Sequence, residues 1–267
     1  MESYFFEPSP RCSPLVRFYL VLKNRDNLCA DKFIPDGNIA LVFNFVNEGI
    51  LIENGESYKL PPHFITVPLV NNYLLKSTSN IDSFIVICKT SILTRLFNLR
   101  LTSTAQSPFY SVDLFNGYPI MAKMRNINSS MKRIRIFEEY LNKNFFLDDY
   151  EADEIDLVYE KIMTSKGCIK ISDLLTDVKM TPRSFRRYFR QRIGISAKEL
   201  LRIVRVNYVW SLCKNKSYID YYNIVYECGF FDQSHFIKDF KKIVGETPKE
   251  FFTRELSQVV FISGRPQ

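Results

Sequence analysis

The stretch CGFFDQSHFIKDFKK, residues 228–242, decides the fold of the C-terminal third of the chain. Gly229 stands where a helix should stop, and Asp232 is a good N-cap for the helix that follows. Phe236 and Phe240 lie four residues apart, so both can face a core from one side of that helix. The residues just before the glycine also have a helical pattern. A helix, a turn and a second helix make a helix-turn-helix unit, whose second helix can enter the major groove of DNA.

An upstream stretch has the same order of a helix, a turn and a second helix. Residues 171–175 are followed by a short link and by residues 181–192, which open with Thr-Pro, a cap followed by a residue preset for the first helical position. Phe185 and Phe189 again lie four residues apart. The sequence therefore predicts two helix-turn-helix units, separated by a long helix expected over residues 197–215.

The outward faces of the two second helices are polar and basic. Arg183, Arg187 and Arg190 share one stripe of the first helix, with Arg186 beside it. Arginines clustered so densely repel one another unless an anion lies against them. Arginine can donate two hydrogen bonds to guanine, or contact phosphates when it lies at the rim. On the second helix, the side chains that can hydrogen-bond to base edges or to phosphate are Gln233, His235 and Lys238. Lys241 and Lys242 follow them and suit contacts to the DNA backbone.

Positive charge is concentrated in the same region. The whole chain has a formal net charge of +7 and a pI near 9.0. Residues 166–254 hold 18 Lys and Arg against nine Asp and Glu, whereas residues 1–150 hold 16 against 14. A basic domain indicates a polyanionic partner, here double-stranded DNA. A basic face that is merely solvated is the alternative on charge alone.

The C-terminal third resembles the AraC/XylS class of bacterial transcription regulators over about residues 160–256. The residues that carry the resemblance are Thr181-Pro182-Arg183, Arg187, Phe189, Gly194-Ile195-Ser196, Arg205, residues 228–236, Phe240-Lys241-Lys242 and residues 245–251. Three positions depart from the family pattern. Leu175 and Val225 replace a small alanine, which implies slightly wider helix packing, and Phe252 replaces an arginine.

The resemblance implies that the two recognition helices enter successive major-groove segments on one face of DNA. Matched position by position, it places base-reading side chains at Arg183, Arg186, Arg187, Gln233, Ser234, His235 and Lys238. We predict phosphate contacts by Arg190, Arg192, Lys241 and Lys242. For Ser234, a role as a helix cap fits equally well. The family leans to activation of transcription, with RNA polymerase as a further partner, so an activator is expected.

The N-terminal part has a different pattern. Short apolar runs alternate with turns such as Asn54-Gly55, a strong hairpin signal, and predict an antiparallel sandwich or small barrel, with a short helix over residues 92–99. Residues 4–118 are similar to a domain found ahead of such units in some bacterial regulators. The similarity is carried by Pro14-Leu15-Val16, Tyr19, Pro35-Asp36-Gly37, Val42-Phe43-Asn44 and residues 61–65. It implies a sensing or dimerising role, with a small-molecule effector that the sequence does not identify.

An amphipathic helix is expected between these parts, because apolar residues recur at steps of three and four from Met131 to Phe145. N-cap candidates precede it at residues 128–130. It either packs on the N-terminal domain or, alternatively, forms the seam of a homodimer. The predicted fold class is α+β: a β-rich sensing or dimerisation domain over residues 1–118, a helical linker over residues 119–150, and an all-α DNA-binding domain over residues 151–267.

Other classes of protein are disfavoured. The motifs of nucleotide-binding loops, serine hydrolases and zinc peptidases are absent, so neither an enzyme nor a cofactor is expected. His63 and His235 are the only histidines, and His63 is expected in a turn or at the surface. Six cysteines without a CxxC pair predict free thiols in a reducing cytosol, and no apolar run approaches a membrane span. A cytoplasmic regulator is expected; the alternative is a ligand-binding or interaction protein whose helical domain has lost DNA binding.

Overall fold

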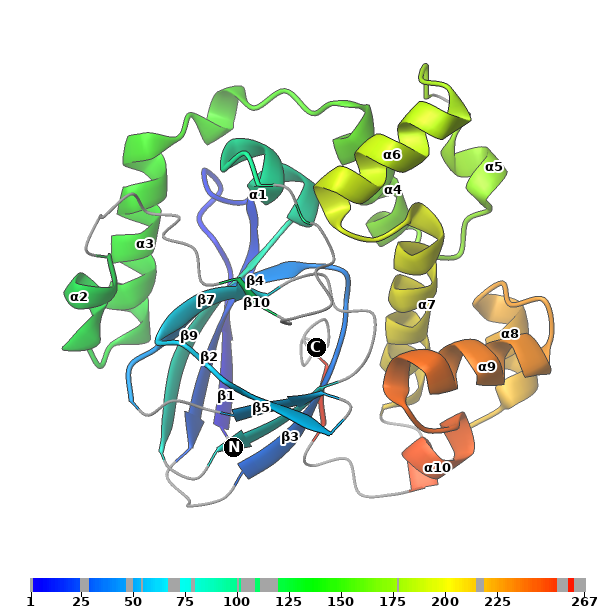
Figure 1. Cartoon of the computed structure of the whole chain (residues 1–267), viewed down its shortest axis with the longest axis horizontal. Coiled ribbons are helices and arrows are strands. Elements are labelled where there is room, and N and C mark those ends of the chain that lie inside the picture. Colours follow the sequence, from blue (N-terminus) through cyan, green and yellow to red (C-terminus); the bar gives the residue numbers. More distant parts are fainter. Residues whose placement is uncertain are drawn as a thin grey trace. The chain divides into compact units, whose positions relative to one another are not determined.

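The computed structural model describes residues 2–24, 29–46, 50–53, 55–66, 73–77, 80–99, 101, 109–110, 120–176, 178–214, 219–253 and 259–261. The chain divides into two compact units, which Figure 1 colours along the sequence. Unit 1 comprises residues 1–30, 38–67 and 75–151, and unit 2 comprises residues 31–37, 68–74 and 152–267.

Unit 1 is built on a six-stranded antiparallel sheet. Its strand order is β1 (Glu2–Phe6), β2 (Val16–Asn24), β9 (Ile81–Cys88), β4 (Ile39–Asn44), β7 (His63–Thr66) and β10 (Phe109–Tyr110). The two central strands are nearly continuous apolar runs, and Leu41 lies opposite Val86 in the register of β4 and β9. The antiparallel N-terminal sheet predicted from the sequence is confirmed. His63 is the first residue of β7 and is partly exposed, so it begins a strand at the surface and does not lie in a turn.

A second sheet has five strands in the order β11 (Val259–Phe261), β3 (Cys29–Ile34), β8 (Tyr73–Ser77), β5 (Ile50–Glu53) and β6 (Glu56–Lys59). The predicted hairpin is present: Glu53 pairs with Glu56, and Gly55 has a φ of 87°, which favours glycine; Asn54 lies outside the described residues. Strand β11 runs parallel to β3, a short β segment that the all-α expectation for the C-terminal region missed.

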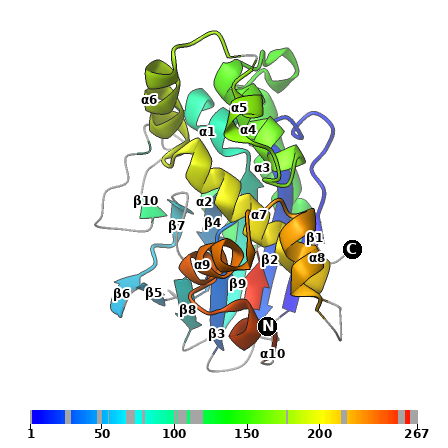
Figure 2. The same ribbon diagram turned by 90° about the vertical axis from the view of Figure 1, so that its right-hand side faces the viewer.

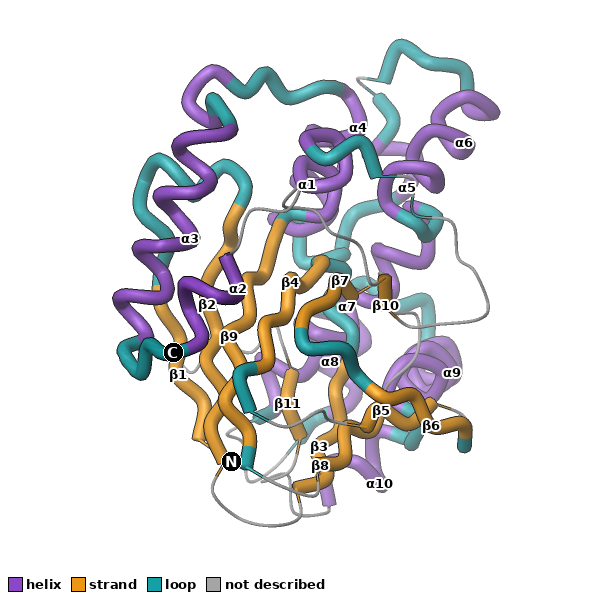
Figure 3. The backbone as a smooth tube through the Cα atoms, turned by 60° about the vertical axis from the view of Figure 1, so that its left-hand side comes forward, coloured by secondary structure: helices purple, strands orange, loops and turns teal. Residues whose placement is uncertain are grey.

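Three α-helices and one 3-10 helix accompany the sheet in unit 1: α1 (Thr90–Leu96), α2 (Ile120–Arg125), α3 (Ser130–Asn144) and η1 (Leu147–Asp149). Helix α3 is the predicted amphipathic helix, and it begins at the expected cap, where the hydroxyl of Ser129 accepts from the amide of Lys132. Figure 3 shows α3 beside β2. Its apolar face lies in the core of unit 1 through Phe137 and Leu141, which confirms the predicted packing. Met131, expected on that face, is exposed.

Unit 2 contains the remaining helices: α4 (Glu154–Thr164), α5 (Ile171–Leu174), α6 (Pro182–Ile193), α7 (Ala197–Cys213), α8 (Tyr221–Glu227), α9 (Gln233–Val244) and α10 (Pro248–Thr253). Helices α5 and α6 form the first predicted helix-turn-helix unit, and α8 and α9 form the second. Figures 1 and 2 show α7 running from the first helix-turn-helix unit to the second helix-turn-helix unit. Helix α5 ends at Leu174, within the residues 171–175 expected before the link. The hydroxyl of Thr176 bonds the carbonyls of Ser172 and Asp173 and so competes with the helical hydrogen bonds.

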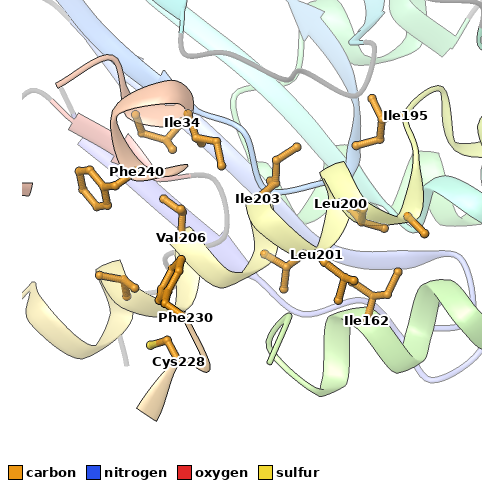
Figure 4. Close-up of a cluster of buried hydrophobic side chains, with 14 of the residues drawn as sticks. Ile34, Ile162, Ile195, Leu200, Leu201, Ile203, Val206, Cys228, Phe230 and Phe240 are labelled. Atoms are coloured by element: carbon orange, nitrogen blue, oxygen red, sulfur yellow. The ribbon is translucent and has the colours of Figure 1, made fainter. Parts of the chain in front are cut away.

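Helix α7 is the centre of the core of unit 2 because it is buried along most of its length. Leu200, Leu201, Ile203 and Val206 from α7 meet Ile162 of α4, Phe230 and Phe240 (Figure 4). The segment of residues 31–37 also belongs to this unit. The buried amide of Asn207 donates to the carbonyl of Pro35 at 2.6 Å, and the hydroxyl of Tyr159 donates to the carbonyl of Gly37 at 3.3 Å.

Candidate nucleic-acid interface

The first recognition helix, α6, is fixed at both ends and along one face. At its start the hydroxyl of Thr181 accepts from the amide of Ser184 at 3.2 Å. At its end Gly194 takes a left-handed conformation with a φ of 86°. Phe185 and Phe189 are buried on the inner face, with ring centroids 5.3 Å apart. Because this pair sets the rotation of the helix, the opposite face points to solvent.

That solvent face carries four arginines: Arg183, Arg186, Arg187 and Arg190, all exposed. Among the described residues, none of the four forms an ion pair with a carboxylate. The guanidinium of Arg187 donates to the hydroxyl of Tyr188 at 2.9 Å and lies 4.7 Å from the centroid of its ring. Arg190 interacts electrostatically with the carboxylate of Glu199, and the other three guanidinium groups face solvent. Like charges gathered in this way are the chemistry of an anion-binding surface.

Arg192, predicted to contact phosphate, lies in a different environment. Its guanidinium is 2.6 Å from a carboxylate oxygen of Asp153 and 3.6 Å from one of Asp156, and its side chain is only 22% exposed. Asp153 is the N-cap of α4. Burial opposes the charge on Asp153, but hydrogen bonds from the Asp156 amide and from Arg192 hold its pKa below the ordinary value. The geometry thus gives Arg192 a structural contact between α6 and α4, and its predicted contact to phosphate stays a prediction.

The second recognition helix, α9, has the same construction. Its N-cap is Asp232, whose carboxylate accepts from the amide of His235 at 2.7 Å, and Gly245 ends it with a φ of 86°. Phe236 and Phe240 are buried. Ser234 is therefore not the cap, and its exposed side chain lies in the first turn. The other predicted contacts that the structure leaves exposed on this helix are Gln233, Lys238, Lys241 and Lys242.

His235 differs from its neighbours on α9 because both ring nitrogens face groups of its own domain. Nδ1 accepts from the amide of Phe231 at 3.4 Å, and Nε2 lies 3.1 Å from a carboxylate oxygen of Asp239. Asp239 is buried and also lies 3.4 Å from Arg202 of α7. The imidazole thus positions the turn ahead of α9, and its predicted contact to a base stays a prediction.

Three exposed aromatic residues near α9 were missed in the sequence analysis. Tyr222 and Tyr226 of α8 are each 84% exposed, and Phe231, in the turn, is 91% exposed. A signal was present, because the two tyrosines lie four residues apart and share a helix face, while Ile224 is the buried residue of α8. Tyrosine hydroxyls can donate to phosphates, so Tyr222 and Tyr226 are additional candidates for DNA contact.

None of the described helices is long and apolar enough to cross a membrane. The described residues also contain no group of three or more side chains that could hold a metal ion.

Known proteins and a family model are similar in sequence to the helical C-terminal region of this chain. A sequence model of the family described as "Helix-turn-helix domain" matches residues 174–254. The HTH-type transcriptional activators RhaR of Yersinia pseudotuberculosis serotype O:1b (strain IP 31758) and of Yersinia pestis bv. Antiqua (strain Angola) are each 26% identical over 105 residues, which is 39% of this chain. The match spans 36% of the length of these relatives.

Two solved structures are also similar to this chain, at lower sequence identity. ToxT from Vibrio cholerae has a TM-score of 0.47 and 17% identity, and the match covers 88% of this chain and 97% of that one. The AraC-like transcriptional activator CuxR has a TM-score of 0.31 and 12% identity, with 80% and 96% covered. At these scores neither structure bears on the site.

Proposed function

We propose, from the premise that residues 174–254 form a helix-turn-helix domain of the AraC type, that the chain is a sequence-specific DNA-binding regulator of transcription. The observation that carries the proposal is the solvent face of α6, where four exposed arginines lie together and none forms a salt bridge with a described carboxylate. A polyanion beside this face would offset the repulsion between its positive charges, and the major groove of DNA is wide enough to admit an α-helix.

The two helices are assigned different contacts. On α6, Arg183, Arg186 and Arg187 read bases, and Arg190 contacts phosphate. On α9 the exposed side chains of Gln233, Ser234 and Lys238 are assigned to bases, and those of Lys241 and Lys242 to phosphates. Bidentate arginine favours guanine, whereas glutamine favours adenine, so the two units are expected to select different short boxes.

The N-terminal unit is assigned a controlling role. In this proposal it senses a small-molecule effector or mediates a homodimer, and the bound regulator activates transcription through RNA polymerase. The support for these parts is the resemblance to AraC-type regulators.

The test is selection of bound sequences from a random DNA pool by the full-length protein at near-physiological salt. The expected product is a site with two short boxes about one helical turn apart. Lys132→Ala is a matched control, because Lys132 is an exposed cation on α3 of unit 1 and should leave the selected site unchanged. Recovery of no motif, with binding that disappears as salt rises, would contradict the proposal and favour an interaction protein with a vestigial helix-turn-helix domain.

A further inference from the structure

Two cysteines of unit 2 lie side by side although they are far apart in the sequence. Cys168 is half-buried in the turn between α4 and α5, and Cys228 is fully buried at the end of α8 (labelled in Figure 4). Each thiol influences the pKa of the other, which indicates that the two side chains lie close together, and the Cys168 thiol itself donates to the carbonyl of Lys166 at 3.4 Å. The pair therefore joins the approach to the first helix-turn-helix unit with the turn of the second.

Arg205 of α7 holds the two backbones together. Its Nε and Nη2 atoms donate to the carbonyl of Gly167 at 2.9 and 2.8 Å, and its Nη1 atom donates to the carbonyl of Gly229 at 3.2 Å. Gly167 directly precedes Cys168, and Gly229 directly follows Cys228. One guanidinium thus fixes the positions of both cysteines.

The backbones of the two turns lie near each other at the glycines. A Cβ atom added to Gly229 would come within 3.9 Å of the carbonyl oxygen of Cys168. Gly167 has a φ of 71°, and a Cβ atom there would lie 2.4 Å from the carbonyl oxygen of Leu201. Only glycine suits that position. The close approach of the two turns that carry the cysteines is therefore built into the domain.

The two sulfurs differ in reactivity in the way that a redox pair requires. The interaction with Cys228 lowers the pKa of Cys168 to about 7, against the opposing effect of burial, with Arg205 and Lys166 adding to the decrease. The same interaction and burial raise the pKa of Cys228. Cys168 is thus a partly exposed thiolate near neutral pH, and Cys228 is a buried neutral thiol beside it.

We propose that Cys168 and Cys228 form a peroxide-sensitive thiol pair that closes to a disulfide. The Cys168 thiolate attacks one oxygen of hydrogen peroxide, the O–O bond breaks, and the leaving hydroxide takes up a proton to become water. The sulfenic acid on Cys168 is then attacked by the sulfur of Cys228. The S–O bond breaks, the S–S bond forms, and the Cys228 proton leaves with the hydroxyl group as a second water. Both thiols are oxidised, and one peroxide is reduced to two waters.

The disulfide would give the helical domain a redox input. A covalent S–S bond is about 2.05 Å long, so closing it draws the turn before α9 toward the turn before α5. The thiol chemistry does not depend on DNA binding and is measured separately from it.

The experiment treats reduced full-length protein with dilute hydrogen peroxide, blocks residual thiols with N-ethylmaleimide, and maps unreduced peptides by mass spectrometry. The expected product is a peptide pair linked through Cys168 and Cys228 that dithiothreitol separates. Its rate of formation should fall about tenfold from pH 8 to pH 6, because a thiol with a pKa near 7 loses about that fraction of its thiolate. A thiol with the ordinary pKa of about 8.5 would slow far more over this range.

Three variants sharpen the result. With Cys228→Ser, Cys168 should accumulate as a sulfenic acid that dimedone traps, and Cys168→Ser should abolish both products. Cys213→Ser is the matched control, because Cys213 is buried in the same unit and should leave the linked peptide unchanged. If Cys228→Ser fails to fold, labelling of the wild-type protein decides, since Cys168 should react with N-ethylmaleimide at least about tenfold faster than Cys213. Absence of the linked peptide, or equal labelling of Cys168 and Cys213, would overturn the proposal.

Discussion

The recognition helices α6 and α9 have the same length and the same two ends. Each has 12 residues, a side-chain cap at its start, a buried phenylalanine pair and a left-handed glycine after its last turn. Their solvent faces differ: four arginines on α6, against Gln233, Ser234 and Lys238 on α9. The comparison shows that the residues that hold the helix are shared between the two units, while the residues that face solvent are not. We infer that the two units read different DNA boxes from equivalent scaffolds.

The two helices are also anchored by different polar contacts. Arg192 in the last turn of α6 pairs with Asp153 at the start of α4. In the first turns of α9, His235 lies against Asp239, which lies against Arg202 of α7. Each anchor joins a recognition helix to a supporting helix of unit 2. The anchors therefore contribute to orientation, and the exposed residues are left for DNA.

The largest expected effect tests the equivalence of the two scaffolds. Phe189→Ala and Phe240→Ala each remove a fully buried ring, and each should lower the free energy of unfolding by about 3–5 kcal/mol. Urea denaturation followed by circular dichroism measures both. Arg186→Ala is the control, since loss of an exposed side chain should change stability by no more than about 0.5 kcal/mol. A loss confined to one phenylalanine would show that the two units are not equivalent.

The next effect tests the arginine face. Arg187→Ala should weaken binding to the selected site by about 1–3 kcal/mol and relax discrimination at one box, because a base contact is lost. Titration of labelled duplexes, specific and random, gives both values. An equal loss on the two duplexes would show that Arg187 contacts only phosphate.

A smaller effect concerns the anchor of α6. Asp153→Ala removes the N-cap of α4 and the Arg192 pair, and should cost about 0.5–2 kcal/mol of stability. The folded-state pKa of Asp153 lies below its ordinary value of 3.8, so its contribution is present above that value and is lost as the pH falls through the folded-state pKa. Asp153→Asn retains a cap but cannot ionise. Its stability should therefore lack this acid-range loss, and identical acid profiles for Asp153→Asn and wild type would refute the role of the pair.

The smallest effect concerns a phosphate contact on α9. Lys242→Ala should weaken binding to specific and random DNA alike, and should reduce the slope of log affinity against log salt by about one. Binding isotherms at several salt concentrations measure the slope. A loss restricted to the specific site would mean that Lys242 reads a base.

Local signals predicted most of unit 2. The cap at Asp232 and the pair Phe236 and Phe240 together define α9, and the structure confirms the expected bounds. Strands β1 and β3 were missed, because β1 is short and exposed and β3 carries Asp31 and Lys32 within a short run. Their pairing partners, not their own residues, make them strands.

The candidate site was predicted in composition but not in its internal contacts. Arg192 could not be separated from the other arginines, because Asp153, its partner, lies far upstream in the sequence. His235 has the residue type of a base contact, and only the folded turn brings the Phe231 amide to its ring. Contacts of this kind depend on tertiary structure and leave no periodic pattern in the sequence.

The most direct test of the account measures binding of the full-length protein to the selected duplex with each box scrambled in turn. Wild-type protein should lose affinity when either box is scrambled. Arg187→Ala should become less sensitive to one box and keep its full sensitivity to the other, and Gln233→Ala should show the opposite pattern. The account is contradicted if scrambling either box leaves wild-type affinity unchanged, or if both variants lose sensitivity to the same box. Either result would mean that the two helix-turn-helix units do not each read a DNA box of their own.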